Sequence, residues 1–495
     1  MLRWMTVVPM LLLAAGATPV RATFYSVAPG QPYATLQDVA PLLAPGDEVE
    51  VTGDATYPGD VVFTRPGTAA QPIVIRGLRV NGQRPVISGG TNGVTFATPW
   101  PYSGPGADHY IFEGFEITDA SFRGLYHQAH DLTVRDVRVH DCAAHGILGA
   151  DQGSGSLTLE FVEVYGCGGG TTHHQIYMAT DETNRPGSVF RMRHCYVHDA
   201  NGGNNVKSRA ERNEIHYNWI EGAVYHELEL IGPDPGMPAA PPREDSDVVG
   251  NVLWCRNDFY VVRCGGDATG ETDGRYRFVH NTVIAMGPAV FRLFDGLESI
   301  EMHNNVFHRL GDGAVTLLRT TEADWATGAA VIAGGGNWVK AGALQVPAEW
   351  TGTVYGTAPG FTDPAAGDLR PLADSPLRDS AVAAPTGPPG FPFPAPLFPP
   401  TCHPPAGVLP VPATAEVRPV DPFLDIGAYE YAAPTIDGDT RWAVTDLVVL
   451  QLTLAGVVTP GQPPCVCPLC ADLDGDGALT PTDSLLLADW LSGNR

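Results

Sequence analysis

The chain has 495 residues and a formal net charge of −26, although only 17% of its residues are charged. This excess of negative charge argues against nucleic acid and anionic membrane surfaces as partners. The length exceeds that of one ordinary compact domain, and the 57 glycines and 45 prolines predict many short strands and turns.

The first 22 residues have the order of a secretion signal. Arg3 precedes an apolar run over residues 5–15, and small residues lead to Ala22. This pattern is typical of a cleaved signal peptide, and the run is shorter than the roughly 20 residues that span a bilayer. We therefore expect a protein without a membrane span that is secreted or attached to the cell surface, where its cysteines could form disulfides.

Residues 110–310 repeat a short unit in which an alternating apolar strand is followed by a polar turn. Equivalent positions lie 22 to 33 residues apart, at Gly114, Asp136, Phe161, His194, Tyr217, Gly250, His280 and Asn304. Alternation with period two indicates strands, and repeats of this length indicate stacked units around one continuous core. The sequence therefore predicts an all-β parallel solenoid.

Two features of the repeats give sharper predictions. Four asparagines occupy one repeat position, as in an asparagine ladder at a turn between strands; they are Asn218, Asn251, Asn281 and Asn305. Cys142 and Cys167 each lie six residues after a repeat position. We therefore expect these two cysteines to stack on adjacent rungs within disulfide range.

Both ends of this region carry a resemblance to a known fold. The segments are Tyr33-Ala34-Thr35-Leu36-Gln37-Asp38-Val39 and Asp425-Ile426-Gly427-Ala428-Tyr429-Glu430. Together with the repeats, they resemble the capping helix and the end of the right-handed parallel β-helix, or pectate-lyase-like, superfamily. The resemblance implies a right-handed parallel β-helix over residues 23–431, with a proline-rich C-terminal cap over about 346–431. The superfamily contains lyases, hydrolases, esterases and non-enzymes, so the fold does not select a reaction.

A second strand of each repeat aligns on an apolar column that is expected to point inward. The column is Leu125, Ile147, Ile176, Val206, Leu228, Tyr260 and Val290. Its neighbours are expected to point outward. Because rungs are about 4.8 Å apart, Tyr177, Lys207 and Glu229 should be stacked neighbours. The flanking outward columns add Gln175, Asn205 and Glu227 on one side, and Arg209 and Arg263 on the other.

This face has the residue types for β-elimination on a uronic-acid polysaccharide. Lys207 is one of only two lysines in the chain, and a lysine can act as a base whereas an arginine cannot. Lys207 would remove the proton at C5, and Tyr177 would protonate the leaving glycosidic oxygen. An arginine would hold the substrate carboxylate. The charges of Arg209 and Arg263 would favour the neutral form of Lys207, whereas Glu229 would oppose it. The expected substrate-binding residues are Gln175, Asn205, Glu227 and Glu229.

The segment Asn205-Val206-Lys207-Ser208, with Asn213 downstream, is similar to the lysine motif of the alginate lyase and chondroitinase B type of β-helix lyase. In that family a catalytic arginine follows one rung later, whereas residues 228–232 contain none. Other functions stay open. They are a β-helix glycoside hydrolase that uses Glu227 and Glu229 as its carboxylate pair, a non-catalytic glycan-binding module, and a structural surface protein.

A further column contains metal-binding residue types, namely His145, His174, Asn204, His226 and Asp258. Imidazole and carboxylate groups suit transition metals, but a polar ladder that caps the turn is the favoured interpretation. A calcium ion on this face of the β-helix is also left open.

Residues 432–495 predict a small helical calcium-binding domain. Carboxylates occupy positions 1, 3, 5 and 12 of an EF-hand-type loop, and Gly477 supplies the turn at position 6. The expected ligands are Asp472, Asp474, Asp476, Thr480 and Asp483. Apolar residues 485–491 then predict the following helix.

Residues 437–452 are a weaker first copy of the same loop and helix. Two such units resemble a type I dockerin, which implies docking onto a cohesin-bearing scaffold protein. The proline-rich residues 385–412 are expected to form an extended cap or linker before this domain.

Overall fold

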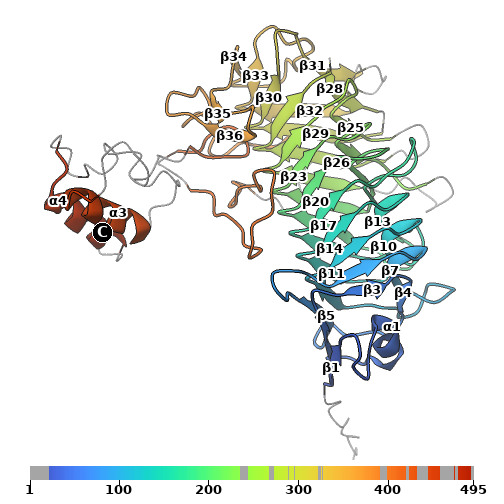
Figure 1. The fold of residues 1–495 in the computed structure, drawn as a ribbon. Coiled ribbons are helices and arrows are strands. Elements are labelled where there is room, and N and C mark those ends of the chain that lie inside the picture. The colour runs from blue at the N-terminus through green and yellow to red at the C-terminus, as the bar shows by residue number, and fades with distance from the viewer. Residues whose placement is uncertain are drawn as a thin grey trace, which may run out of the picture.

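The computed structural model describes residues 22–234, 244–266, 272–287, 289–294, 296–320, 325, 327–388, 390, 398–419, 423–431, 444–457, 473 and 478–491. Its main body is a parallel β-helix in which the chain passes through three long parallel sheets in turn (Figure 1). The sheets are named A, B and C in the order in which each rung visits them. The prediction of an all-β parallel solenoid is therefore confirmed for this part of the chain.

Sheet A contains β1 (Phe24–Val27), β2 (Glu48–Thr52), β5 (Ile73–Leu78), β8 (Tyr110–Glu113), β11 (Leu132–Arg135), β14 (Leu157–Glu160), β17 (Val189–Arg193), β20 (Arg212–His216), β23 (Asp245–Val249), β26 (Arg275–Val279), β29 (Ser299–His303) and β32 (Val331–Gly335). Sheet B contains β3 (Thr56–Pro58), β6 (Val86–Ser88), β9 (Glu116–Thr118), β12 (Arg138–His140), β15 (Glu163–Tyr165), β18 (Tyr196–His198), β21 (Trp219–Glu221), β24 (Val252–Trp254), β27 (Thr282–Ala285), β30 (Val306–Arg309), β33 (Trp338–Lys340) and β34 (Val354–Gly356).

Sheet C contains β4 (Val61–Phe63), β7 (Asn92–Ala97), β10 (Arg123–Gln128), β13 (His145–Gly149), β16 (Ile176–Ala179), β19 (Val206–Arg209), β22 (Leu228–Leu230), β25 (Val262–Cys264), β28 (Ala289–Leu293) and β31 (Thr316–Thr320). An antiparallel pair, β35 (Phe361–Asp363) and β36 (Asp368–Pro371), follows the last rung. The helices among the described residues are α1 (Leu36–Val39), α3 (Val444–Leu454) and α4 (Pro481–Leu491), with a short 3-10 helix at Ala40–Leu42.

The corner between sheets A and B has the same length in every rung from β8 to β33. Each repeat position predicted from the sequence has a positive φ, from 50° at Asp136 to 85° at Gly114. Strand pairing places Arg135 beside Glu160 and Arg138 beside Glu163, so Asp136 and Phe161 are equivalent. This pairing confirms the predicted repeat register. In each of these rungs, one residue in the left-handed region turns the chain from sheet A into sheet B.

The predicted asparagine ladder lies inside this corner and extends to Asn337. The Oδ1 atom of Asn281 accepts hydrogen bonds from the backbone N and the Nδ2 of Asn251, both at 2.9 Å. Nδ2 of Asn281 donates to Asn305 Oδ1 and to Val248 O, again at 2.9 Å. These amides are fully buried, so each rung satisfies the polar groups of the next one inside the core.

The N-terminal end of the solenoid is covered by α1, as the resemblance implied. Leu36 and Val39 are fully buried on the end of the core. The backbone N–H of Thr35 donates to Asp38 Oδ2 at 2.8 Å, which satisfies a free donor at the start of this short helix.

The C-terminal part of the solenoid region includes a long segment outside the rungs. Residues 398–419 and 423–431, here called the strap, run along the corner between sheets A and B (Figure 1). Thr401 N donates to Tyr217 Oη at 3.2 Å, and Ala428 N donates to Thr282 Oγ1 at 3.0 Å. Arg418, itself buried, forms a 2.7 Å ion pair with Glu430. The strap therefore stabilises several rungs at once.

The two helices predicted near the C-terminus are present as α3 and α4. They pack through Val449 and Leu450 on α3 and Leu487 on α4. Among the helices that the structure describes, none is long and apolar enough to cross a membrane. The proposed signal peptide lies outside the described residues, apart from Ala22.

The asparagine ladder gives a direct stability test. Replacing Asn281 with alanine leaves the buried N–H groups of Asn251 without their acceptor, so we expect a loss of roughly 3 kcal/mol in unfolding free energy. Denaturant unfolding followed by circular dichroism would measure it. Asn201→Ala is the control, because Asn201 is exposed and its side chain makes one bond, to Gly166 O. Equal losses for the two variants would contradict a dominant role of the ladder.

Candidate functional site

One outward column of sheet C gathers polar side chains from successive rungs. Strand pairing places Tyr177 beside Lys207, Lys207 beside Glu229, and Glu229 beside Arg263. The inward column that supports them is fully buried and comprises Ile176, Val206, Leu228 and Val262. The predicted stacking of Tyr177, Lys207 and Glu229 is confirmed.

The last two rungs of the predicted alignment are wrong, the first by two residues and the second by one. Val262, not Tyr260, pairs with Leu228 and points inward, and Phe291, not Val290, continues that column. The extra residues form a turn in which Asn257 Nδ2 donates to Ala223 O at 2.7 Å. As a result, Arg263 lies in the same column as Lys207 and Glu229, and not beside Arg209 in a flanking one.

These residues line a cleft of about 400 Å³. Its walls are Thr171, Thr172, His174, Tyr177, Asn204, Lys207, Arg209, Tyr225, Glu229, Asp234 and Arg263. Of the eight residues predicted to form the site, the structure brings five together here, namely Tyr177, Lys207, Arg209, Glu229 and Arg263.

Glu229 is the centre of the charge network on the cleft floor. Its side chain is 1% exposed and accepts hydrogen bonds from Arg263 and from Asn204. Lys207 Nζ lies 3.7 Å from Glu229 Oε2 and 5.5 Å from the centroid of the Tyr177 ring. The Glu229 carboxylate therefore lies between a lysine on the rung before it and an arginine on the rung after it.

Asp234, which the sequence analysis missed, organises the opposite side. Tyr177 Oη donates to Asp234 Oδ2 at 3.4 Å, and Arg209 Nη2 forms a 3.0 Å ion pair with Asp234 Oδ1. Burial raises the pKa of Tyr177, so its phenol keeps its proton at neutral pH. Asp234 follows β22 in a corner with no repeat pattern, and no sequence signal marks it.

Gln175, Asn205 and Glu227 do not face the cleft, so the prediction that they point outward is wrong. All three are fully buried and hydrogen-bond in series, with Gln175 Nε2 3.0 Å from Asn205 Oδ1 and Asn205 Nδ2 2.5 Å from Glu227 Oε2. Burial raises the pKa of Glu227 to about 8. The three residues precede the strands, where alternation no longer applies, and their side chains fill the corner between sheets B and C. None of the three lines the cleft.

The histidine column forms the expected polar ladder. His174 N donates to His145 Nδ1 at 3.1 Å, and Asn204 N donates to His174 Nδ1 at 2.9 Å. The next step is from His226 N to Asn204 Oδ1, at 3.1 Å. Burial lowers the pKa of His145 to about 4 and that of His174 to about 2. Asp258 lies outside this column because of the two-residue shift. Within the described ranges, no three His, Cys, Asp or Glu side chains are arranged to hold a metal ion.

Only part of the predicted calcium loop can be described. Asp472, Asp474 and Asp476 lie outside the described residues. Thr480 N donates to Asp483 Oδ2 at 2.8 Å, and Leu473 N donates to Asp483 Oδ1 at 2.7 Å, at the start of α4. Asp483 thus joins the loop to the helix, and the calcium site itself stays a prediction.

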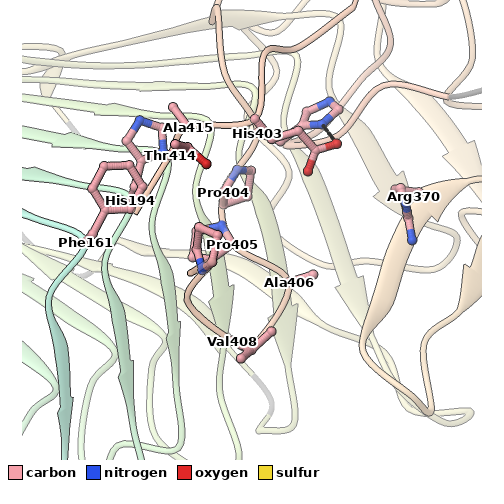
Figure 2. A pocket seen from close by; sticks show the side chains of 12 residues that line it. Phe161, His194, Arg370, His403, Pro404, Pro405, Ala406, Val408, Thr414 and Ala415 are labelled. Carbon is pink, nitrogen blue, oxygen red and sulfur yellow. Dashed lines mark hydrogen bonds and ion pairs between the residues drawn. The ribbon is translucent and has the colours of Figure 1, made fainter. Parts of the chain in front are cut away.

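A second hollow, of about 310 Å³, lies between the strap and the corner of sheets A and B (Figure 2). Phe161 and His194 stack there with ring centroids 5.0 Å apart, and His403 Nδ1 lies 3.3 Å from Glu416 Oε1. Burial lowers the pKa of His194 to about 4. The remaining wall combines prolines of the strap with Arg370, Thr414 and Glu416.

Behind Arg209, the corner between sheets C and A buries several carboxyl groups. Glu211 and Glu244 directly precede the paired residues Arg212 and Asp245, so they are neighbours across rungs. Both carboxyl oxygens of Glu244 are buried, and no described residue donates a hydrogen bond to either of them. Burial raises the pKa of Glu244 well above its usual range and that of Glu182 to about 7.

The comparisons with known proteins are distant. No protein-family model and no curated protein sequence matches the chain. Pectate lyase Pel9A is 14% identical with a TM-score of 0.48, over 83% of this chain and 96% of that one. An alginate lyase from Paenibacillus is 16% identical with a TM-score of 0.42, over 61% and 99%. A lacto-N-biosidase from Eubacterium ramulus is 12% identical with a TM-score of 0.36, over 68% and 67%. Matches this distant select no reaction.

The buried carboxyl groups predict a specific dependence of stability on pH. A carboxyl group with a raised pKa binds its proton more tightly in the folded state, so its contribution to stability falls as pH rises above about 4.3, the pKa in the unfolded chain. We therefore expect Glu244→Gln to raise the thermal unfolding temperature at pH 8 and to change it little at pH 4. Glu48→Gln, at an exposed position, should have little effect at either pH. A Glu244→Gln variant that is less stable at pH 8 would contradict this assignment.

Proposed function

We propose that the protein is an exported polysaccharide lyase that cleaves a uronic-acid-containing polysaccharide by β-elimination. The observation that carries the proposal is the placement of Lys207 beside Tyr177 on adjacent rungs of one cleft, with arginines on both sides. A base, a proton donor and a carboxylate-binding cation are the three groups that this reaction needs.

In the proposed reaction, Lys207 in its neutral form takes the proton from C5 of the uronate. The electron pair forms the C4–C5 double bond as the bond from C4 to the glycosidic oxygen breaks. Tyr177, which burial keeps protonated, gives its proton to that oxygen. Arg263 neutralises the substrate carboxylate, which makes the C5 proton easier to remove.

The charge distribution supports an acidic substrate. Arg263 and Arg292 are paired neighbours in the column that also contains Lys207. Arg292 lies over the ring of Phe294 at 4.4 Å. In a chain with a net charge of −26, consecutive arginines along one face provide the local cationic surface that a polyanion requires.

The hydrolase alternative loses its carboxylate pair. Glu227 is fully buried in the corner between sheets B and C, and both oxygens of Glu229 are engaged by Asn204, Lys207 and Arg263. Neither residue presents a free carboxyl group to a glycosidic bond, as hydrolysis requires. The remaining alternatives are a non-catalytic glycan-binding module with the same cleft and a structural surface protein.

For the C-terminal region we propose a dockerin-like domain that binds calcium and docks onto a cohesin-bearing scaffold protein. The packing of α3 against α4 supports it, because a paired-loop domain needs its two helices to share an apolar face. The acidic loop before α4 supplies hard oxygen ligands of the kind that calcium prefers.

The lyase proposal predicts the effect of one substitution. Lys207→Arg keeps the positive charge near Glu229 but removes the base, so we expect at least a roughly 100-fold loss of unsaturated product. The wild-type protein and the variant would be incubated with a panel of uronic-acid polysaccharides, and the unsaturated product would be measured by its ultraviolet absorbance. Lys340→Arg is the matched control, since the amine of Lys340 donates to the backbone at Arg309 and Gly311. Wild-type turnover by Lys207→Arg would reject the mechanism, and a wild-type protein that binds but cleaves no uronate would favour the glycan-binding alternative.

The calcium proposal has its own test. Calcium should protect residues 470–495 from proteolysis in the full-length protein, because the ligands converge only when the loop is folded. Asp476→Ala should remove most of this protection, whereas Asp439→Ala in the weaker first loop should remove less. Equal effects of the two substitutions, or no protection by calcium, would reject the dockerin-like assignment.

A further inference from the structure

Two buried cysteines lie on neighbouring rungs at the corner where sheet B leads into sheet C. β12 and β15 pair with Val139 beside Val164 and His140 beside Tyr165. Cys142 and Cys167 each follow two residues after these strands, so they occupy equivalent positions. Both side chains point into the core, where their residues are 2% and 0% exposed.

The two sulfur atoms are close to each other. Cys142 N lies 3.4 Å from Cys167 Sγ. A hydrogen bond between the two thiols is the largest influence on the pKa of each, lowering that of Cys142 and raising that of Cys167. Neighbouring rungs of a parallel sheet are about 4.8 Å apart, which is within the usual range of Cα separations for a disulfide.

The opposite wall of the core leaves room for these sulfur atoms. Gly124 and Gly146 follow the paired residues Arg123 and His145 in sheet C. A Cβ atom added at Gly124 would lie 3.1 Å from Cys142 Sγ, and one added at Gly146 would lie 3.3 Å from Cys167 Sγ. Each sulfur atom therefore lies next to a glycine of the preceding rung.

Other buried cysteines are engaged differently. Cys195 Sγ lies 3.3 Å from Arg193 O, and Cys255 Sγ lies 3.2 Å from Asn257 Oδ1. Cys142 Sγ also lies 3.4 Å from a backbone oxygen, that of His140, but Cys142 and Cys167 contact each other in addition.

We propose that the exported protein carries a cross-rung disulfide between Cys142 and Cys167. This inference rests on the export part of the proposed function and is independent of the lyase chemistry. The Cys142–Cys167 disulfide forms by thiol–disulfide exchange during folding, with a small-molecule disulfide such as oxidised glutathione as the oxidant. The Cys142 thiolate attacks that disulfide and releases one reduced glutathione. The Cys167 thiolate then attacks the Cys142 sulfur and releases the second, and the two thiol protons pass to solvent and the departing thiolates.

The disulfide would fix the rung that leads into the cleft. Cys167 N donates to Gln175 Oε1 at 3.1 Å, and Gln175 begins the buried series that continues through Asn205 to Glu227. These residues lie next to the strands that carry Tyr177, Lys207 and Glu229. The cross-link thus stabilises the corner from which the strands of the site begin.

The test maps thiols in the full-length protein folded in a buffer of reduced and oxidised glutathione. The protein is denatured with iodoacetamide without reductant, digested, and analysed by mass spectrometry. We expect one linked pair of peptides containing Cys142 and Cys167, two hydrogens lighter than the sum of the free peptides, whereas Cys195 and Cys255 are alkylated.

A matched pair of variants completes the test. Cys142→Ala should make Cys167 fully alkylated, whereas Cys195→Ala should leave the Cys142–Cys167 link intact. Wild-type protein in which Cys142 and Cys167 are both alkylated would overturn the proposal, as would a link from either residue to a different cysteine. Because the readout is a peptide mass, a result against the disulfide is distinct from a failure of lyase activity.

Discussion

The register of the solenoid depends on the corner between sheets A and B. Two residues join the sheets in every rung from β8 to β33, the first in the left-handed region and the second directed into the core. Where that second residue is asparagine, its amide binds both neighbouring rungs. A corner of constant length with buried, mutually dependent hydrogen bonds leaves no freedom for one rung to slip against the next.

The constant corner also decides where the site can form. Differences in rung length must fall at the other two corners, which are the two borders of sheet C. The corner from B to C supplies Thr171 and Thr172 to the cleft, and the corner from C to A supplies Asp234. The floor between them is a regular strand surface. Function can therefore vary through these two sets of loops while the register of Tyr177, Lys207 and Glu229 is kept.

The parts of the structure that could be predicted are those governed by short-range periodicity. The left-handed positions, the asparagine ladder and the stacking of Tyr177 on Lys207 all follow from alternation and repeat spacing. The errors occur where alternation ends. Arg263 was assigned to a flanking column because the two extra residues near Asn257 carry no sequence signal, and Gln175 was assigned to the surface although a corner turns its side chain inward.

Long-range contacts were the other source of error. Asp234 contacts Tyr177 from a corner 57 residues later in the chain, and the strap returns to Tyr217 from 184 residues away. Neither contact is encoded in a local pattern, since both depend on how many rungs lie between the partners. The strap is rich in proline. Its composition predicts an extended segment but not the surface on which that segment lies.

The strap also sets a limit on how this solenoid can change in length. It contacts Tyr217, His280 and Thr282 at fixed points of its own sequence. A rung duplicated between β20 and β27 would move these contact points apart by about 4.8 Å, and Arg418 could no longer reach His280 while Thr401 stayed on Tyr217. The strap thus fixes the number of rungs in the C-terminal half. No hydrogen bond of this kind is described for the rungs before β17. Natural or engineered gain of rungs is accordingly expected in the N-terminal half of the coil.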